Sequence, residues 1–270
     1  MGNPSTPRLS NPVHAASAAA GGGGGGAHAL PGSHVMAGHT AAHEEHPATS
    51  FGAGAHNPNL QHHFYGMAQQ LEASILGMWV FLVTEIMFFG GMFMIYILYR
   101  VVYPEAWVLG SNHLDVVLGA LNTAVLICSS LTMAMAVRSA QVGSYRGQIV
   151  NLILTVLFGS VFLIVKYFEY AEKFEHRLVP GPNFDMTLPL ANQQQLFFSI
   201  YFMLTGVHAA HMVVGIVLML VILAMAWRGK FSPSYYTPVE VSGLYWHFVD
   251  IVWIFLFPLL YLLGAHVTAH

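Results

Sequence analysis

The sequence has very little charge and almost no cysteine. Only 8% of its 270 residues are charged and 56% are hydrophobic, whereas soluble domains carry about 25% charged residues. This balance predicts a membrane protein. The net charge of -3 gives no basic surface for nucleic acid, so no nucleic-acid partner is expected. Cys128 is the one cysteine, which excludes a disulfide, a thiolate zinc site, a C-x-x-C-H haem attachment and a dicysteine copper site within the chain.

Residues 1–62 differ in composition from the rest of the chain. They contain the glycine run Gly21 to Gly26, many alanines and few large apolar side chains. Such a segment cannot bury enough surface to offset its ordering entropy, so we predict a disordered tail before a transmembrane domain at 63–270. The tail can bind metal, collect protons for a larger complex or be compositional drift. Nine of the 16 histidines lie in residues 1–63, and they are His14, His28, His34, His39, His43, His46, His56, His62 and His63.

Five long apolar runs follow the tail, at about 73–98, 116–137, 149–170, 196–226 and 244–265. Each is long enough to cross a hydrocarbon core as a helix, for which about 20 residues suffice. Because backbone groups in lipid must be hydrogen-bonded internally, the predicted fold is an all-α, polytopic bundle of five transmembrane helices. Lys and Arg are slightly more frequent in the loops after the second and fourth runs. This bias predicts that the N-terminus lies inside and the C-terminus outside.

Small and aromatic residues indicate how these helices pack and where they end. The second run carries a stripe of small and hydroxyl side chains suited to close helix contact, and Gly90 and Gly91 are assigned the same role in the first run. The stripe comprises Gly119, Asn122, Thr123, Ser129 and Ser130. Aromatic residues near the ends of the runs are expected to anchor the helices at the membrane interfaces. They are Tyr99, Tyr103, Trp107, Trp227, Tyr245 and Trp246.

The first and third runs carry charged residues at membrane depth. Glu85 lies at the centre of the first run, where a carboxyl group is costly and usually faces the bundle interior, so we expect it to be neutral or paired. It is a site for lipid, protons or a partner, or else an interhelical bond that only fixes packing. Lys166 and Glu169 stand three residues apart and can form an ion pair near the outer interface. That pair is structural or belongs to a proton path.

Histidines and carboxylates also mark the fourth and fifth runs. His208 and His211 share one helical stripe but cannot reach both faces of a haem, and no intramembrane Glu-x-x-His motif accompanies them. A buried hydrogen-bond role is therefore favoured over metal ligation. Glu240, His247 and Asp250 share a face of the fifth run, where His247 and Asp250 are expected to bond directly. We predict one intramembrane polar packing network of His208, His211, Glu240, His247 and Asp250, with no catalytic residue and no metal or cofactor ligand.

Five strings, taken in order, resemble the third subunit of haem–copper terminal oxidases, in its five-span bacterial form. They are TEIMFFGGMF (84–93), LNTAVLICSS (121–130), FEY (168–170), TGVHAAHMVVG (205–215) and YWHFVDIVWIFLF (245–257). The resemblance implies a complex that reduces oxygen to water and pumps protons. It also implies that this subunit itself holds no haem or copper, packs on subunit I, holds structural phospholipid and helps to sustain proton uptake and stability. Haem and copper are then expected in the partner subunits I and II.

The resemblance also assigns roles to single residues. Glu85 matches the family's buried carboxylate, which is known for its reactivity with carbodiimides, and the five residues of the predicted polar network match the family's intramembrane polar set. Arg228 and Lys230 lie where the family has basic residues near lipid phosphates, and Arg177 is a third candidate. The chain departs from the seven-span pattern in three features: its tail replaces two helices, Lys166 stands at a usually neutral position, and the 171–195 loop is longer.

Several functions remain compatible with the sequence. The leading hypothesis is the non-catalytic subunit III of a cytochrome c oxidase in the aerobic respiratory chain of a bacterial cell membrane. Cytochrome c would act through subunit II, and a respiratory supercomplex is a possible larger partner. The same subunit of a quinol oxidase is the alternative. A stand-alone proton-coupled transporter is more distant because the sequence has no inverted repeat and no pair of broken helices, and a dimetal membrane enzyme is more distant still.

Overall fold

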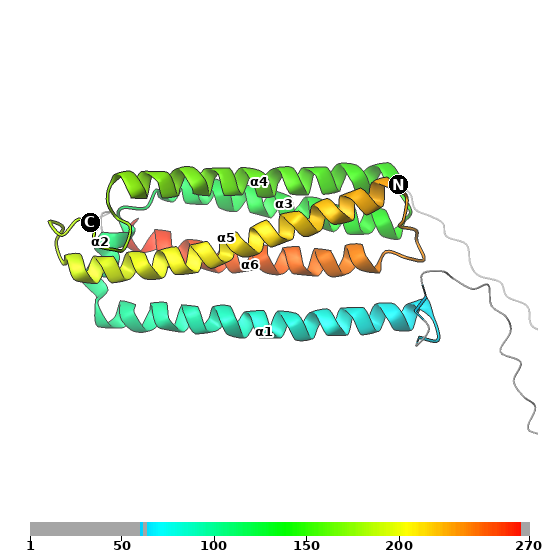
Figure 1. Ribbon diagram of the computed structural model, residues 1–270, viewed down its shortest axis with the longest axis horizontal. Coiled ribbons are helices and arrows are strands. Elements are labelled where there is room, and N and C mark those ends of the chain that lie inside the picture. The colour runs from blue at the N-terminus through cyan, green and yellow to red at the C-terminus, as the bar shows by residue number, and fades with distance from the viewer. Residues whose placement is uncertain (1–59, 62–63, 266–270) are drawn as a thin grey trace, which may run out of the picture. The chain divides into compact units, whose positions relative to one another are not determined.

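The chain folds as a bundle of long helices that run side by side in the computed structural model, which describes residues 60–61 and 64–265, with side chains up to residue 262 (Figure 1). The helices are α1 (Met67–Val102), α2 (Pro104–Ser111), α3 (Val116–Gln141), α4 (Tyr145–Glu175), α5 (Ala191–Trp227) and α6 (Thr237–Ala265). The described residues form no strand, only an isolated bridge between Ser232 and Tyr235. The predicted tail, 1–62, lies outside the described residues except for 60 and 61.

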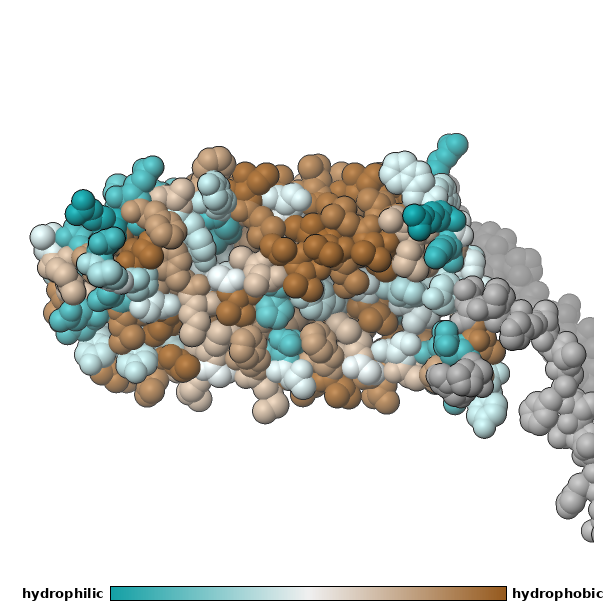
Figure 2. Space-filling view, in the orientation of Figure 1, coloured by the Kyte–Doolittle hydropathy of each residue, from teal (hydrophilic) through white to brown (hydrophobic). Residues whose placement is uncertain are grey.

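Five of these helices, α1, α3, α4, α5 and α6, are long and apolar enough to cross a membrane. The predicted all-α bundle of five transmembrane helices is therefore confirmed, while the side of the membrane on which each end lies stays a prediction. Apolar surface covers the middle of the helices and polar side chains gather towards the two ends (Figure 2). Most helices extend a few residues beyond the predicted apolar runs, because their backbone hydrogen bonds continue into the flanking polar residues.

The short helix α2 is the element that the sequence did not predict. Pro104 occupies its first position, where a missing backbone N–H costs nothing. The helix inserts Trp107 into the bundle with 1% of the residue exposed, so Trp107 is not an interfacial anchor. The same correction applies to Tyr245 and Trp246, which are buried in α6. Trp227 is exposed at the end of α5, where an anchor was expected.

Helix α6 is the centre of the bundle. The most apolar part of α6 is 56% buried, against 22–33% for the other four spans, and α6 packs against α1, α2, α3 and α5. Its Trp246 fits between Gly159 of α4 and Gly215 of α5. A Cβ atom at either glycine would come within 2.7 or 3.0 Å of the indole ring. Glycine at these two positions therefore makes room for the indole ring of α6 against α4 and α5.

The stripe of small and hydroxyl residues on α3 makes close helix contacts, as predicted, and several of them are with α6. The indole N–H of Trp246 donates to Ser129 Oγ at 3.0 Å, and that of Trp253 donates to Thr123 Oγ1 at 3.0 Å. A Cβ atom on Gly119 would lie 2.8 Å from the Phe257 ring. Hydroxyl groups and missing side chains thus let the large aromatic residues of α6 lie against α3 with their donors satisfied.

Helix α1 runs along one side of the bundle (Figure 1). It contacts α6, α2 and α5, and among the described residues it has no contact with α3 or α4. A Cβ atom at Gly90 or Gly91 would meet no atom of another helix within 4 Å, so the close packing predicted for them within the bundle is wrong. An apolar groove of about 570 Å³ lies between α1 and α6, lined by residues such as Trp79, Phe93 and Phe255. Helix α1 is consequently the least embedded of the five spans.

Candidate functional site

Glu85 pairs with His211 and so joins α1 to α5. Glu85 Oε2 lies 3.2 Å from His211 Nε2, and the two side chains are 18% and 20% exposed. His211 Nδ1 lies 2.8 Å from the carbonyl oxygen of Val207. Because a carbonyl only accepts, this contact assigns the donor role to Nδ1 and leaves Nε2 facing the carboxyl group of Glu85. The expectation that Glu85 is neutral or paired is thus met by its pairing with His211 at the edge of the bundle.

His208 lies on the same helix as His211 but in a different environment. It is fully buried, and neither ring nitrogen has a hydrogen-bond partner among the described residues. Its ring contacts those of Trp253 and Phe162, with centroids 5.2 and 5.5 Å away. The buried hydrogen-bond role predicted for His208 is therefore wrong. The ring is held by aromatic packing, although a buried polar group without a partner costs about 1–3 kcal/mol.

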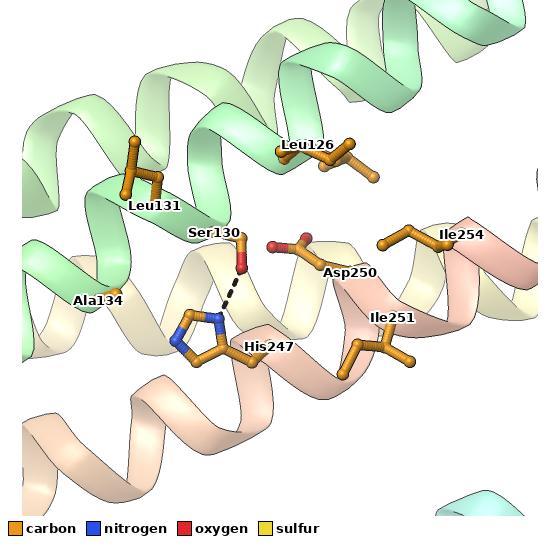
Figure 3. Close-up of a pocket in the computed structure, with 9 residues that line it drawn as sticks. Leu126, Ser130, Leu131, Ala134, His247, Asp250, Ile251 and Ile254 are labelled. Carbon is orange, nitrogen blue, oxygen red and sulfur yellow. Dashed lines mark hydrogen bonds between the residues drawn. The ribbon is translucent and has the colours of Figure 1, made fainter.

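Asp250 and His247 line a small cavity between α3 and α6 (Figure 3). His247 Nδ1 lies 2.7 Å from the hydroxyl of Ser130 on α3, so the direct bond predicted between His247 and Asp250 is wrong. Asp250 is 2% exposed, and neither of its carboxyl oxygens has a hydrogen-bond partner within the described residues. The Ser130 hydroxyl lies between the two side chains (Figure 3). The sequence predicted only a packing role for Ser130, because the spacing within α3 does not indicate a contact with α6.

Glu240 lies apart from these groups. It stands in the first turn of α6, seven residues and about 10 Å of helix before His247. Its Oε2 atom is buried without a partner in the described part of the chain. The structure thus divides the predicted network of five residues among separate places: His211 faces α1, His208 is buried against aromatic rings, His247 and Asp250 share the cavity, and Glu240 lies at the start of the helix.

The predicted ion pair of Lys166 and Glu169 is present, with Nζ and Oε2 2.8 Å apart. The two residues are 4% and 2% exposed, so the pair lies inside the bundle rather than near its surface. Two tyrosines complete it. Lys166 Nζ donates to Tyr261 at 2.8 Å and to Tyr201 at 3.3 Å. Both hydroxyls in turn donate to Glu169 Oε1, at 2.9 Å from Tyr201 and 2.6 Å from Tyr261.

This lysine–glutamate–tyrosine cluster connects three helices. Lys166 and Glu169 come from α4, Tyr201 from α5 and Tyr261 from α6. Lys166 Nζ also lies 5.1 Å from the centre of the Trp253 ring, a distance at which a cation is attracted to an aromatic face. Every polar atom of the ion pair therefore has a partner inside the chain. Sequence spacing indicated the pair itself, but not the tyrosines, which lie 32 and 92 residues away from Glu169.

The basic candidates for lipid lie at the two ends of the bundle. Arg228 and Lys230 are exposed just after α5, close to the α3–α4 turn, where the Tyr145 hydroxyl donates to the Trp227 carbonyl at 3.0 Å. Arg177 is exposed just after α4, at the opposite end (Figure 1). No group of three or more metal-binding side chains occurs among the residues that the structure describes.

A cavity at His113 brings several titratable groups together near the end of α4. It has a volume of about 410 Å³ and is lined by His113, Glu172, Lys173, His176, Leu178, Asp185 and Leu188. Burial lowers the pKa of His113, and the positive charges of Lys173 and His176 lower it further. The Thr187 hydroxyl and backbone N–H, which both bond Asp185, lower the pKa of that exposed carboxyl group.

Comparison of the chain with known proteins identifies a family that it resembles along most of its length. The model of the family described as cytochrome c oxidase subunit III matches residues 61–265. Cytochrome c oxidase subunit 3 of Corynebacterium diphtheriae is 36% identical over 188 residues, which are 69% of this chain and 86% of that protein. Quinol oxidase subunit 3 of Bacillus spizizenii is 31% identical over 71% of this chain and 87% of that protein.

A third relative is cytochrome bo(3) ubiquinol oxidase subunit 3 of Pseudomonas aeruginosa, which is 30% identical over 71% of this chain and 86% of that protein. The five apolar helices and these bacterial relatives identify the chain as a multi-pass integral membrane protein of a bacterial membrane. The family match covers all five spans, and it makes the chain the subunit III of a haem–copper oxidase complex. This chain belongs to the cytochrome c oxidase subunit III family.

Proposed function

We propose that the chain is the non-catalytic subunit III of a proton-pumping cytochrome c oxidase. In this role it packs on subunit I, holds phospholipid and supports proton uptake and the stability of the complex. Haem and copper belong to subunits I and II, and cytochrome c delivers electrons through subunit II. The family match over residues 61–265 carries the proposal. Cytochrome c is favoured as the donor because the C. diphtheriae relative is 36% identical, against 31% and 30% for the two quinol oxidase relatives.

The Glu85–His211 pair supports a role in lipid and proton handling. Helix α1 touches the bundle mainly through α6, and the pair supplies a polar bond from α1 to α5. Breaking that bond would loosen the wall of the apolar groove between α1 and α6, which is suited to an acyl chain. Arg228 and Lys230 at one end, or Arg177 at the other, would hold the phosphate group of a lipid.

Purification of the native assembly through a tag on this chain tests the main proposal. We expect mass spectrometry to find subunits I and II, the optical spectrum to show haem, and the enzyme to oxidise reduced cytochrome c. A second subunit without bound copper, together with activity on quinol only, would transfer the proposal to a quinol oxidase. Recovery of this chain without oxidase subunits would refute both forms.

Glu85→Gln tests the role of the pair within the complex. The substitution keeps the side-chain size but replaces the carboxyl group that faces His211 with an amide, so we expect less bound phospholipid, slower proton uptake and a shorter lifetime during turnover. Glu72→Gln is the matched control, since Glu72 lies on the same helix and is exposed at its start. If Glu85→Gln matches the wild type in all three measurements, the role assigned to Glu85 is wrong.

A further inference from the structure

The cavity between α3 and α6 has a polar floor and an apolar rim. Its volume is about 270 Å³, and it is lined by Leu126, Ile127, Ser130, Leu131, Ala134, His247, Asp250, Ile251 and Ile254. The three polar side chains, Ser130, His247 and Asp250, lie together, with the aliphatic residues around them (Figure 3). The rim residues Ile127, Leu131 and Ile254 are 54%, 62% and 46% exposed, so the cavity opens on the outside of the bundle.

The floor of this cavity lacks a hydrogen-bond donor. Both carboxyl oxygens of Asp250 are without a partner in the described chain. The Ser130 hydroxyl has a single proton, and it already lies 2.7 Å from His247 Nδ1. Turning that proton towards Asp250 would serve only one of its two oxygens. An ionised Asp250 would therefore keep at least one oxygen that needs a donor, and burying that oxygen unsatisfied costs about 1–3 kcal/mol.

The depth of Asp250 determines what can supply the donor. It lies 13 residues after the start of α6 and 15 before its end, which is about 20 Å of helix on each side. The hydrocarbon core is about 30 Å thick, so lipid headgroups lie about 15 Å from its middle. Acyl chains have no donor, and headgroups do not reach this depth. A polar side chain on another transmembrane helix can both reach the cavity and donate.

We propose that the α3–α6 cavity is the docking site for a transmembrane helix of a partner oxidase subunit, which inserts a hydrogen-bond donor towards Asp250. The inference rests on the proposed function and adds the surface and the chemistry of the contact. Ile127, Leu131 and Ile254 form an apolar ring around the donor site and keep water from it. A polar contact inside an apolar ring is the arrangement that contributes most at interfaces.

Photo-crosslinking in the purified complex tests the surface. A benzophenone amino acid is placed singly at Ile127, Leu131 or Ile254, and at Ile164 of α4 and Val213 of α5 as exposed apolar controls. We expect the three rim positions to attach to a transmembrane segment of a partner subunit at least several times more than the controls do. The attached segment should carry a donor side chain within one helical turn of the attachment point.

Each other outcome of the crosslinking overturns the inference. Rim positions that attach only to lipid, to a second copy of this chain or to a purely aliphatic segment would show that no partner donor occupies the cavity. These results leave the proposed function intact as long as the chain co-purifies with the oxidase. Failure to co-purify would instead refute the proposed function, so the two failures are distinguishable.

Substitution of Asp250 tests the chemistry. Asp250→Leu removes the acceptor, whereas Asp250→Asn keeps an acceptor oxygen in a side chain of similar size. We expect the leucine variant to be lost from the complex during detergent washing about tenfold faster than the wild type, and the asparagine variant to lie much closer to the wild type. Glu72→Leu is the control, since it removes an exposed carboxyl group at the start of α1, outside the cavity. Equal loss for the leucine variant and the control would refute the contact.

Discussion

Glu169 and Asp250 are both buried carboxyl groups in the same apolar bundle, and each residue is 2% exposed. Glu169 accepts hydrogen bonds from Lys166, Tyr201 and Tyr261. Asp250 has no hydrogen-bond partner among the described residues. Taking a carboxyl group out of water costs a similar free energy at both positions. The two sites therefore differ in which hydrogen-bond donors offset that cost. The chain itself compensates Glu169, while Asp250 faces a cavity on the outer surface.

The two sites also differ in their place in the bundle. The lysine–glutamate–tyrosine cluster lies where α4, α5 and α6 meet, so its bonds hold three helices in register. The Asp250 cavity lies on the face formed by α3 and α6, away from that junction. An intramembrane charge with complete partners can therefore be explained by stability, whereas one without partners points to a neighbour outside the chain. Mutations at the two sites should therefore change the free energy of unfolding in opposite directions.

Lys166→Met gives the largest expected effect. It leaves Glu169 buried with two tyrosine donors and no cation, which should lower the free energy of unfolding by about 3 kcal/mol, at the lower end of the range for breaking a buried ion pair because those donors remain. Denaturant unfolding of the purified chain in detergent, followed by tryptophan fluorescence, measures the change. The Trp253 ring lies 5.1 Å from Lys166 Nζ and should report the loss directly.

The double variant Lys166→Met with Glu169→Leu is the control for this prediction. Replacing a whole buried ion pair by apolar residues is often neutral, so the double variant should recover most of the loss. If it is as unstable as Lys166→Met, the cost comes from packing rather than from a stranded charge. The comparison between the two sites would then lose its electrostatic basis.

Periodicity and spacing predicted what is local in the sequence. The five apolar runs predicted the five spans, and the three-residue spacing of Lys166 and Glu169 predicted their ion pair. Helix α2 escaped prediction because its eight residues are too short to show a period. The contacts of Tyr201 and Tyr261 with Glu169 could not be predicted, because a single sequence does not show how neighbouring helices are aligned along their axes.

The wrong expectations share one physical cause. His247 and Asp250 lie on one face of α6, but Ser130 of α3 faces His247 more directly, so the bond crosses between helices. Tyr245 and Trp246 stand near the start of α6, where an aromatic residue is typical of an interface, yet α6 is the central helix and buries them. Knowledge of which helix occupies the centre requires the packing itself.

Asp250→Leu in the purified chain should have the opposite sign to Lys166→Met. Removing an acceptor without a partner abolishes its desolvation cost, so the free energy of unfolding should rise by about 1–3 kcal/mol. Leucine can extend into the adjoining cavity of about 270 Å³ without strain. The same denaturant measurement in detergent detects the gain. A loss of stability would mean that Asp250 is compensated within the chain, and the contrast with Glu169 would fail.

His113, in the loop before α3, is a partly buried titratable group outside the membrane. Its burial predicts a smaller effect, on the pH dependence of stability. Burial, and then the charges of Lys173 and His176, lower the pKa of His113. The unfolded chain therefore binds this proton more readily than the folded chain, so stability should be constant above the unfolded pKa of about 6.5 and fall as the pH drops below it. Thermal unfolding of the purified chain between pH 7.5 and about 5 measures this dependence. His113→Gln should flatten it and Lys173→Met should weaken it, whereas an unchanged slope in both variants would show that other groups govern the acid sensitivity.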